Sequence, residues 1–541
     1  MASASSPHTE NPAPGLGSRD VSGERLEREV PAEVRHARGQ YFTPDRLVDF
    51  VLELAGGGKS SDPIVLDPAC GSGRFLLAAR ERWELPTLAL RGFETDPRAL
   101  GLAREHLPGA HLFASDFREA RPAGDVDLLV GNPPYVRDRG AKRDLYVDFL
   151  EVAGGHLREG GRLALVLSNA WLDVGYGRLV RQLLRDQFAV EWIVESSVER
   201  WFEGAKVNTM VLVARRCASS AERDSQPVRF GLLKAPLPSS PQVVREISQR
   251  ELSVEQPWGP LLRAPNLFLD VHGMAGARGL VQLGDLVRLR RGFTTNDNSF
   301  FYPPSGAEIE QEYLWPLLKS PKRVGGVHGR ADDLKERVFL CPRSREGLQR
   351  LGHTGALAWL DRHRAGQPQS SWTLPSREPA RLFLVKGYAD RFRQPLFDRP
   401  VHGDQQLYSV YPNDSGLDET LLAALFNSSW FHLSLEMAGR VNFGDGVLWL
   451  SVADAREQIL VPDVRALAPQ VAARLRQAFL ELPKSRVPTA GRVSLDPDWG
   501  PAVRRLDEVV GSLLGLSKRE GAALQREWAA RCDQRLAMSS K

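Results

Sequence analysis

Short apolar runs alternate with helical patterns through the N-terminal half of this chain, and this alternation constrains the fold more than any other feature. The runs are short and bounded by turn residues, which is typical of buried strands. They span Ile64–Leu66, Leu88–Phe93, Val126–Val130, Leu163–Leu167 and Val207–Val213, and helical patterns span Arg74–Arg82, Ala99–His106 and Leu145–Leu157. The alternation predicts an α/β domain with a mixed, mainly parallel sheet, which binds ligands at the carboxyl ends of its strands.

Length and composition predict more than one domain, since 42% of the 541 residues are hydrophobic and can form a large core. The polar stretches Cys217–Gln226 and Pro236–Gln242 are typical of linkers. Beyond them the chain is irregular and aromatic-rich until helical patterns resume at Val464–Leu480 and Ala502–Ala529. We therefore expect a disordered lead-in over 1–25, the α/β domain over 26–225, an α+β domain over 226–465 and C-terminal helices over 466–541.

The sequence favours a cytosolic protein without a membrane span, a disulfide framework or a metal centre. No apolar run approaches the roughly eighteen residues needed to cross a bilayer, and the N-terminus lacks the layout of a secretory signal. The four cysteines, Cys70, Cys217, Cys341 and Cys532, lie far apart and form no CxxC pair. The formal net charge of +4 permits a polyanionic partner without requiring one.

A glycine-rich turn, DPACGSG at residues 67–73, lies between the first predicted strand and a predicted helix. Its glycines allow the backbone to approach a ligand closely. Glu94 ends the next predicted strand, where its carboxylate could accept the hydroxyls of a ribose. Asp67 would repel a pyrophosphate but could accept the ammonium of a methionine moiety. The pattern therefore favours S-adenosylmethionine over NAD, although an ordinary strand-to-helix loop would give the same turn.

Two further segments have ambiguous roles when each is taken alone. Asp116 and Phe117 follow a further predicted strand at Ala110–Ala114. Asp116 could accept an adenine amino group and Phe117 could flank the ring, but a helix N-cap beside a core aromatic residue fits equally well. Upstream, GQYFTP at residues 39–44 precedes a helical pattern, and Pro44 is an ordinary residue at a helix start.

The segment Asn132-Pro133-Pro134-Tyr135 directly follows the predicted strand that ends near Val130. An exocyclic amino nitrogen is a poor nucleophile because its lone pair is delocalised into the aromatic ring. The side-chain carbonyl of Asn132 and the main-chain carbonyl of Pro133 could accept its two hydrogens and localise that lone pair. Tyr135 supplies a flat face for an extruded base. The alternative is a simple turn, but the position after a cofactor-type turn favours catalysis.

The order of the motifs resembles that of the gamma class of DNA adenine-N6 methyltransferases, particularly single-chain Taq-type modification enzymes. The motifs are GQYFTP at residues 39–44, DPACGSG at 67–73, FETD at 93–96, SDF at 115–117 and NPPY at 132–135. The resemblance implies a Rossmann-like, S-adenosylmethionine-dependent domain, methylation of adenine N6 in double-stranded DNA, and a C-terminal target recognition domain. It implies catalysis at Asn132–Tyr135 and an aromatic contact to the flipped adenine from Phe202, beside Trp201. The cofactor contacts that we expect are Tyr41, Thr43, Asp67, Ala69, Gly71, Gly73, Glu94, Asp116 and Phe117.

The recognition half must supply cations for phosphates and polar side chains that read base edges. The expected DNA-binding residues are Arg288, Arg290, Arg291, Thr294 and Asn296, beside Thr295 and Asn298, with a further basic surface from Lys319, Lys322, Arg323, Lys386, Arg391 and Arg393. Solvated surface charge is the alternative interpretation of each cation.

We find no nuclease constellation, and about 40 residues before the catalytic domain are too few for a nuclease domain. We therefore expect modification without intrinsic cleavage, with a cognate restriction endonuclease or other defence-system subunits as partners. Three alternatives remain open: methylation of a protein glutamine, methylation of RNA adenine, and a DNA-specificity subunit of a larger defence complex. The first two need no large second domain that resembles a DNA reader, and an intact NPPY argues against the third.

Overall fold

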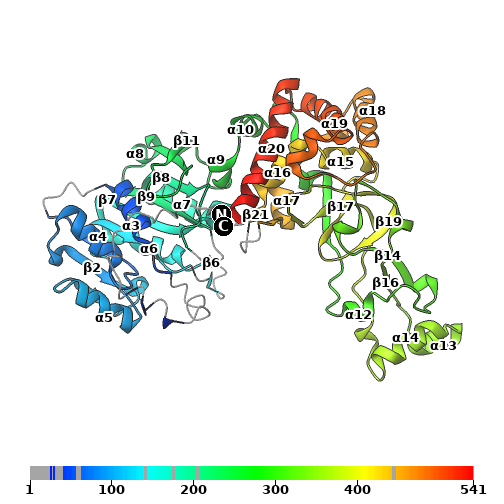
Figure 1. Ribbon diagram of the computed structural model, residues 1–541, viewed down its shortest axis with the longest axis horizontal. Helices are drawn as coiled ribbons and strands as arrows, with labels where there is room; N and C mark the ends of the chain where they lie inside the picture. Colours follow the sequence, from blue (N-terminus) through cyan, green and yellow to red (C-terminus); the bar gives the residue numbers. More distant parts are fainter. Residues whose placement is uncertain are drawn as a thin grey trace, which may run out of the picture. The chain divides into compact units, whose positions relative to one another are not determined.

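The computed structural model describes residues 23, 25–26, 29–30, 41–56, 62–135, 137–138, 143–173, 177–202, 208–441 and 446–539. Nearly all of the expected lead-in over residues 1–25 lies outside these ranges, as does the start of the GQYFTP segment. The chain divides into two compact units, Met1–Leu262 and Arg263–Lys541, which are coloured blue to green and green to red in Figure 1.

Unit 1 is built on a nine-stranded sheet with the order β11-β10-β8-β9-β7-β4-β1-β2-β3. Neighbouring strands run parallel from β7 to β3 and between β8 and β10, whereas β9 runs antiparallel to both of its neighbours. The expected mixed, mainly parallel sheet is thus confirmed. The strands are β1 (Val65–Asp67), β2 (Leu90–Phe93), β3 (His111–Phe113), β4 (Val126–Gly131), β7 (Leu157–Ser168), β8 (Phe188–Ser196), β9 (Thr209–Arg216), β10 (Pro227–Leu233) and β11 (Gln242–Ser248).

Helices cover both faces of this sheet because alternate strand residues point to opposite sides. Leu128 packs into one buried cluster with residues of α3 and α4, whereas its neighbour Leu129 packs into another with residues of α6 and α7. The carboxyl ends of the central strands are thereby held between two cores. The named helices of unit 1 are α3 (Asp45–Ala55), α4 (Arg74–Trp83), α5 (Pro97–His106), α6 (Tyr146–His156), α7 (Gly177–Gln187), α8 (Ser220–Ser225) and, at the end of the unit, α9 (Gly259–Arg263). A short pair of strands, β5 (Arg137–Asp138) and β6 (Arg143–Asp144), precedes α6.

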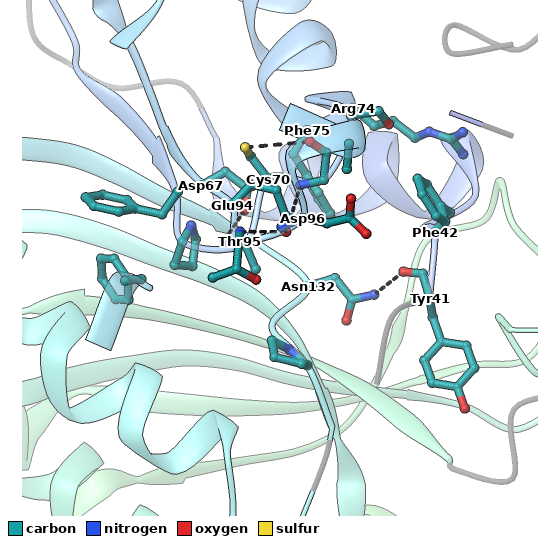
Figure 2. A pocket seen from close by; sticks show the side chains of 18 of the residues that line it. Tyr41, Phe42, Asp67, Cys70, Arg74, Phe75, Glu94, Thr95, Asp96 and Asn132 are labelled. Atoms are coloured by element: carbon teal, nitrogen blue, oxygen red, sulfur yellow. Dashed lines mark hydrogen bonds between the residues drawn. The ribbon is translucent and has the colours of Figure 1, made fainter. Parts of the chain in front are cut away.

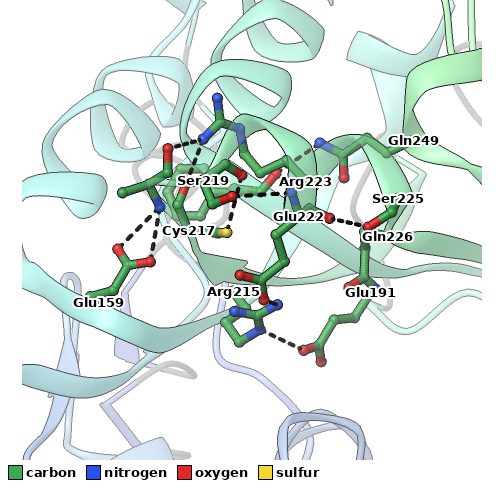
Figure 3. Close-up of polar contacts among 12 residues, drawn as sticks. Glu159, Glu191, Arg215, Cys217, Ser219, Glu222, Arg223, Ser225, Gln226 and Gln249 are labelled. Atoms are coloured by element: carbon green, nitrogen blue, oxygen red, sulfur yellow. Dashed lines mark hydrogen bonds and ion pairs between the residues drawn. The ribbon is translucent and has the colours of Figure 1, made fainter.

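The segment Cys217–Gln226 is not the linker that its polar composition predicts. It forms the capped helix α8, in which the Ser219 side chain accepts the Glu222 N–H. The Ala218 N–H donates to Glu159 at 2.9 Å, and Arg223 donates to the Cys217 carbonyl at 2.7 Å (Figure 3). The bond to Glu159 joins the segment to β7 of the sheet, and the bond from Arg223 closes the segment on itself.

The expected domain boundary at residue 225 is also wrong. Strand β10 pairs in parallel with β8, and β11 pairs with β10 across the stretch Pro236–Gln242 that was expected to be a linker. The sheet therefore continues past residue 225, and the first compact unit ends at Leu262.

Unit 2 has the expected α+β architecture. Its seven-stranded sheet contains β13 (Val287–Arg291), β14 (Leu314–Leu318), β15 (His328–Gly329), β16 (Arg337–Phe339), β17 (Ala380–Val385), β19 (Leu396–Gly403) and β20 (Leu407–Pro412). Smaller sheets contain β12 (Leu280–Gln282), β23 (Leu460–Pro462), β18 (Gly387–Tyr388), β21 (Arg440–Val441) and β22 (Leu448–Trp449). The longer helices are α10 (Asn266–Gly273), α14 (Thr354–Arg364), α15 (Glu419–Phe426), α16 (Ser429–Ala438), α18 (Pro469–Leu480), α19 (Trp499–Leu513) and α20 (Lys518–Ser539). The shorter ones are α11 (Leu283–Leu286), α12 (Asn298–Phe301), α13 (Arg345–Leu351) and α17 (Val452–Gln458).

The C-terminal helices α18, α19 and α20 do not form a region of their own. Their buried residues, such as Phe479 and Trp528, belong to the same hydrophobic cluster as Phe383 of β17 and Phe431 of α16. Over the residues described, we find no helix whose length and apolar character would let it cross a membrane. The same residues contain no group of three or more His, Cys, Asp or Glu side chains that could hold a metal ion.

Candidate functional site

The turn after β1 depends on two glycines with left-handed backbone conformations. Gly71 has a φ of 54° and Gly73 has a φ of 90°, which L side chains rarely adopt. Gly73 forms the N-cap of α4, and the Cys70 N–H donates to the Phe93 carbonyl at 2.8 Å. The DPACGSG segment is thereby folded back against the end of β2.

Asp67, at the end of β1, is a buried carboxyl at the base of this turn and is 1% exposed. Its Oδ1 accepts the Ala69 N–H at 3.0 Å. Burial raises the pKa of Asp67 to about 8, the bond from Ala69 opposes that rise, and the nearby Glu94 adds to it. Gly131 makes room for this carboxyl, because a Cβ at that position would lie 2.5 Å from the Asp67 Oδ1.

Glu94 connects the turn after β1 to the turn after β2. One carboxylate oxygen accepts the Gly71 N–H at 2.9 Å, and the other accepts the N–H groups of Thr95 and Asp96 at 2.7 Å each. Burial raises the pKa of Glu94, although these three bonds favour its ionised form. A carboxylate has about four lone-pair sites, so acceptor capacity remains for a ligand.

A cavity of about 770 Å³ opens at the carboxyl ends of β1, β2 and β4, within the size range of small-molecule sites. Figure 2 shows its side chains, with Asp67, Cys70 and Glu94 on one side and Asn132 and Tyr41 on the other. Of the residues expected to bind the cofactor, the cavity is lined by Tyr41, Thr43, Asp67, Ala69, Gly71, Glu94, Asp116 and Phe117. Gly73 does not line the cavity and instead starts α4.

Asp116 and Phe117 have the positions that the helix-cap interpretation predicts, and they also border the cavity. Asp116 caps a short 3-10 helix, η2 (Phe117–Glu119), and the Phe117 ring is buried in the core. Both residues nevertheless line the cavity. Arg118 donates to the Asp116 carboxylate through Nη2 at 2.6 Å, and this bond lowers the pKa of Asp116. An ionised acceptor is therefore fixed at the wall of the cavity.

The side chain of Asn132 is oriented by the segment around Tyr41. Its Nδ2 donates to the Tyr41 carbonyl at 3.2 Å and to the Thr43 hydroxyl at 3.1 Å, and the first of these bonds is drawn in Figure 2. Because the Tyr41 carbonyl can only accept, it fixes which end of the amide is nitrogen. The Asn132 Oδ1 points the other way and accepts a hydrogen bond from the Tyr135 hydroxyl.

Three aromatic rings meet beside Asn132. The ring centroids of Tyr41, Tyr135 and Phe202 lie 6.1–6.4 Å from one another. The neighbouring Trp201 packs instead against Phe50 of α3 at 6.4 Å. Phe202, rather than Trp201, therefore lies next to the Asn132–Tyr135 segment.

Among the residues of the site that sequence reasoning missed, Arg74, Arg118 and Gly131 position the predicted ones. Arg74 lines the cavity and donates to the Thr43 carbonyl at 2.8 Å, which joins the start of α4 to the Tyr41–Thr43 segment. Arg118 and Gly131 act on Asp116 and Asp67, as described above. The one available signal was Gly131 itself, because a glycine inside a buried strand indicates a close approach of another group.

The polar residues expected to bind DNA lie on β13 and the loop that follows it in unit 2. Arg288, Arg290, Arg291, Thr294 and Asn296 are all exposed there. Arg288 lies over the Tyr411 ring, and Arg291 donates to the side chain of Gln405 at 2.9 Å. Thr295 is buried and donates to Asn298. These two side chains bond to each other and are less available to read bases.

Comparison with known proteins places a methyltransferase domain in unit 1. A family model described as a methyltransferase small domain matches residues 58–191. The Type II methyltransferase M.XamI of Xanthomonas campestris pv. amaranthicola is 26% identical over 72% of this chain and 79% of its own length. M.TthHB8I of Thermus thermophilus is 32% identical over 34% of this chain and 47% of its own length. The chain thus spans about half the length of the second relative.

Among solved structures, the Type IIL restriction-modification enzyme MmeI has a TM-score of 0.54 and 13% sequence identity, over 95% of this chain and 77% of that one. This likeness extends the shared fold across both units. Together with the two buried carboxyl groups and the size of the cavity, the comparisons support a methyltransferase whose cofactor is S-adenosylmethionine.

Proposed function

We propose that this chain is the modification enzyme of a restriction-modification system, which transfers the methyl group of S-adenosylmethionine to N6 of an adenine extruded from double-stranded DNA. The similarity to Type II methyltransferases supports a DNA methyltransferase. The choice of an amino nitrogen as the acceptor depends on one observation, the orientation of Asn132 by Tyr41 and Thr43 at the cavity wall.

The cavity residues fit the cofactor by their chemistry. The Asp67 carboxyl would hold the ammonium of the methionine moiety, Glu94 the ribose hydroxyls and Asp116 the adenine amino group. When bound, S-adenosylmethionine supplies an electrophilic methyl group on a sulfonium. The glycine turn leaves room for it, because a Cβ at Gly71 would meet no protein atom within 4 Å.

Asn132 and Pro133 are assigned the activation of the acceptor nitrogen. The Asn132 Oδ1 and the Pro133 carbonyl would each accept one amino hydrogen and so localise the nitrogen lone pair toward the methyl group. Among the described residues, no backbone donor bonds to the Pro133 carbonyl. Oδ1 can accept two hydrogen bonds, so the substrate can share it with the Tyr135 hydroxyl or displace that hydroxyl. No strong base is required.

The direct test is methyl transfer from labelled S-adenosylmethionine to duplex DNA, RNA and protein, followed by identification of the modified base. We expect label in duplex DNA as N6-methyladenine. Label in RNA or in a protein glutamine, or label in DNA on cytosine, would contradict the proposal.

Thr43→Val should lower kcat about 10-fold while Thr43→Ser stays close to the wild type, because valine keeps the shape of threonine but removes one acceptor of Asn132. Steady-state kinetics with both variants check this expectation. A higher KM for S-adenosylmethionine with an unchanged kcat would instead assign Thr43 to cofactor binding alone.

Binding of S-adenosylmethionine at pH 7 should release about one proton, because the pKa of Asp67 is about 8 and an ammonium beside it favours the ionised form. The release should disappear as the pH rises through 8, where the carboxyl is ionised before the cofactor binds. Calorimetry in two buffers with different ionisation enthalpies measures it. Glu94→Gln should keep the release and Asp67→Asn should lose it. Identical enthalpies in both buffers at pH 7 would refute this reasoning.

A further inference from the structure

Arg393 of unit 2 is a buried cation that is held by a main-chain carbonyl. Its side chain is 8% exposed. Its Nε and Nη2 both donate to the Pro321 carbonyl, at 3.1 and 2.7 Å, which fixes the plane of the guanidinium. Within the described residues, no carboxylate lies within ion-pair distance of it. The carbonyl satisfies part of its hydrogen-bonding capacity but leaves its charge uncompensated.

Two more arginines lie beside it on different segments. Arg391 donates to the Val487 carbonyl at 2.7 Å, and the Val487 N–H donates to the Gly325 carbonyl at 2.9 Å. A Cβ at Gly325 would lie 3.6 Å from the Cα of Arg486. The segments 321–326, 391–393 and 484–487 therefore adjoin. We call Arg391, Arg393 and Arg486 the arginine cluster.

The arginine cluster carries an excess of positive charge. Burial lowers the pKa of the Arg393 guanidinium. The positive charges of Arg391 and Arg486 lower this pKa further, whereas the negative charge of Asp390 raises it. Lys322 and Lys484 add exposed cations on two of the same segments. A buried charge among like charges is costly unless an ion of opposite sign compensates it. The guanidinium fork matches the geometry of phosphate, and two of the three forks are already held in place by carbonyls.

We propose that the arginine cluster binds a phosphate group of the DNA backbone. This proposal rests on the proposed function, which identifies the partner as DNA. It adds a contact outside the β13 segment, and it gives the segment 484–487 of the C-terminal region a part in DNA binding. Phosphate contacts position a protein on the duplex without reading its sequence, so the contact should be the same for every duplex.

The test uses the full chain, the double variant Arg391→Gln/Arg486→Gln and the control Arg519→Gln. Arg519 is an exposed cation on α20, roughly 20 Å along the helix from Cys532, whose thiol donates to the Ala389 carbonyl near the cluster. Arg393 is left intact because it is buried. A melting curve for each variant checks that the variant is folded.

Anisotropy of a labelled random-sequence duplex across a series of KCl concentrations is the main measurement. The double variant should bind about 10-fold more weakly at low salt. Its plot of the logarithm of the binding constant against the logarithm of the KCl concentration should have a slope that is less negative by about 0.9, the value for one lost phosphate contact. Arg519→Gln should match the wild type. Unchanged affinity and slope in the double variant, or an equal loss in the control, would overturn the proposal.

Thermal stabilisation by inorganic phosphate, against chloride at equal ionic strength, is measured in parallel. We expect the wild type to be stabilised more than the double variant. Stabilisation that depends on the cluster, without any effect of the variant on duplex binding, would show that the site takes free phosphate and not DNA. If the wild type bound no duplex at all, the proposed function would fail, and the phosphate measurement would still test the anion site.

Discussion

Asn132→Ala should lower the rate constant of methyl transfer by about 10²–10³, the effect seen when a preorganised polar group is removed from a transition state. The affinities for S-adenosylmethionine and for duplex DNA should stay within about 3-fold of the wild type, since the lost acceptor acts on the reacting nitrogen. Single-turnover transfer measures the rate, and calorimetry and anisotropy measure the two affinities. Turnover above a tenth of the wild-type rate would remove Asn132 from this role.

Asn132→Asp is the matched control. The carboxylate keeps the acceptor oxygen but places a second oxygen against the Tyr41 carbonyl, which has no hydrogen to donate. The Thr43 hydroxyl can rotate and donate instead. We therefore expect a rate between those of the wild type and Asn132→Ala, and a rate equal to that of alanine would show that orientation matters more than the acceptor itself.

A mismatch opposite the target adenine distinguishes the role of Asn132 in catalysis from the role of Tyr135 in holding the base. Extrusion of the base costs a few kcal/mol, and a mismatch lowers that cost. Tyr135, with Phe202, is assigned the holding of the extruded base, a contact worth about 1–3 kcal/mol. A mismatch should thus partly rescue Tyr135→Ala but not Asn132→Ala. Equal rescue of both variants would contradict this division of roles.

The local chemistry of the site could be predicted from the sequence, whereas its long-range contacts could not. Gly71 lies in the turn after one predicted strand and Asn132 comes soon after another, so their place at one edge of the sheet followed from the α/β pattern. The bond between Asn132 and Thr43 joins residues 89 apart in the chain. No periodicity encodes such a contact, and the resemblance assigned Thr43 only to the cofactor.

The boundary of the first unit was mispredicted for a related reason. The two polar stretches that were expected to be linkers are the short surface helix α8 and the loop between the paired strands β10 and β11, and polar composition does not distinguish these from a linker. Strand β11 is an edge strand with no buried residue, and its sequence QVVREIS mixes polar and apolar side chains. Strand β10 pairs in parallel with β8, and the chain connects these two strands through β9 and α8. The predicted boundary therefore fell inside the connection between two neighbouring strands of one sheet.

A fragment that ends at Leu262 should bind S-adenosylmethionine within about 3-fold of the full chain and yet lose detectable site-specific DNA methylation. All the residues that line the cofactor cavity belong to unit 1, the compact unit that ends at Leu262. Base readout is assigned to unit 2, and specific contacts raise affinity for a DNA site by about 10³-fold or more over non-specific binding.

The position of the cut matters, and a shorter fragment ending at Arg216 is the matched comparison. That cut removes β10 and exposes the unpaired edge of β8, and it also removes Gln249, whose side chain accepts the Val190 N–H at 2.8 Å. The cut also removes Trp258, whose ring centroid lies 5.8 Å from that of Trp171. Because exposed strand edges promote aggregation, this fragment should be insoluble or poorly folded. Sequencing that detects modified bases compares both fragments with the full chain. Methylation of the same site by the Leu262 fragment would show that unit 1 reads DNA by itself.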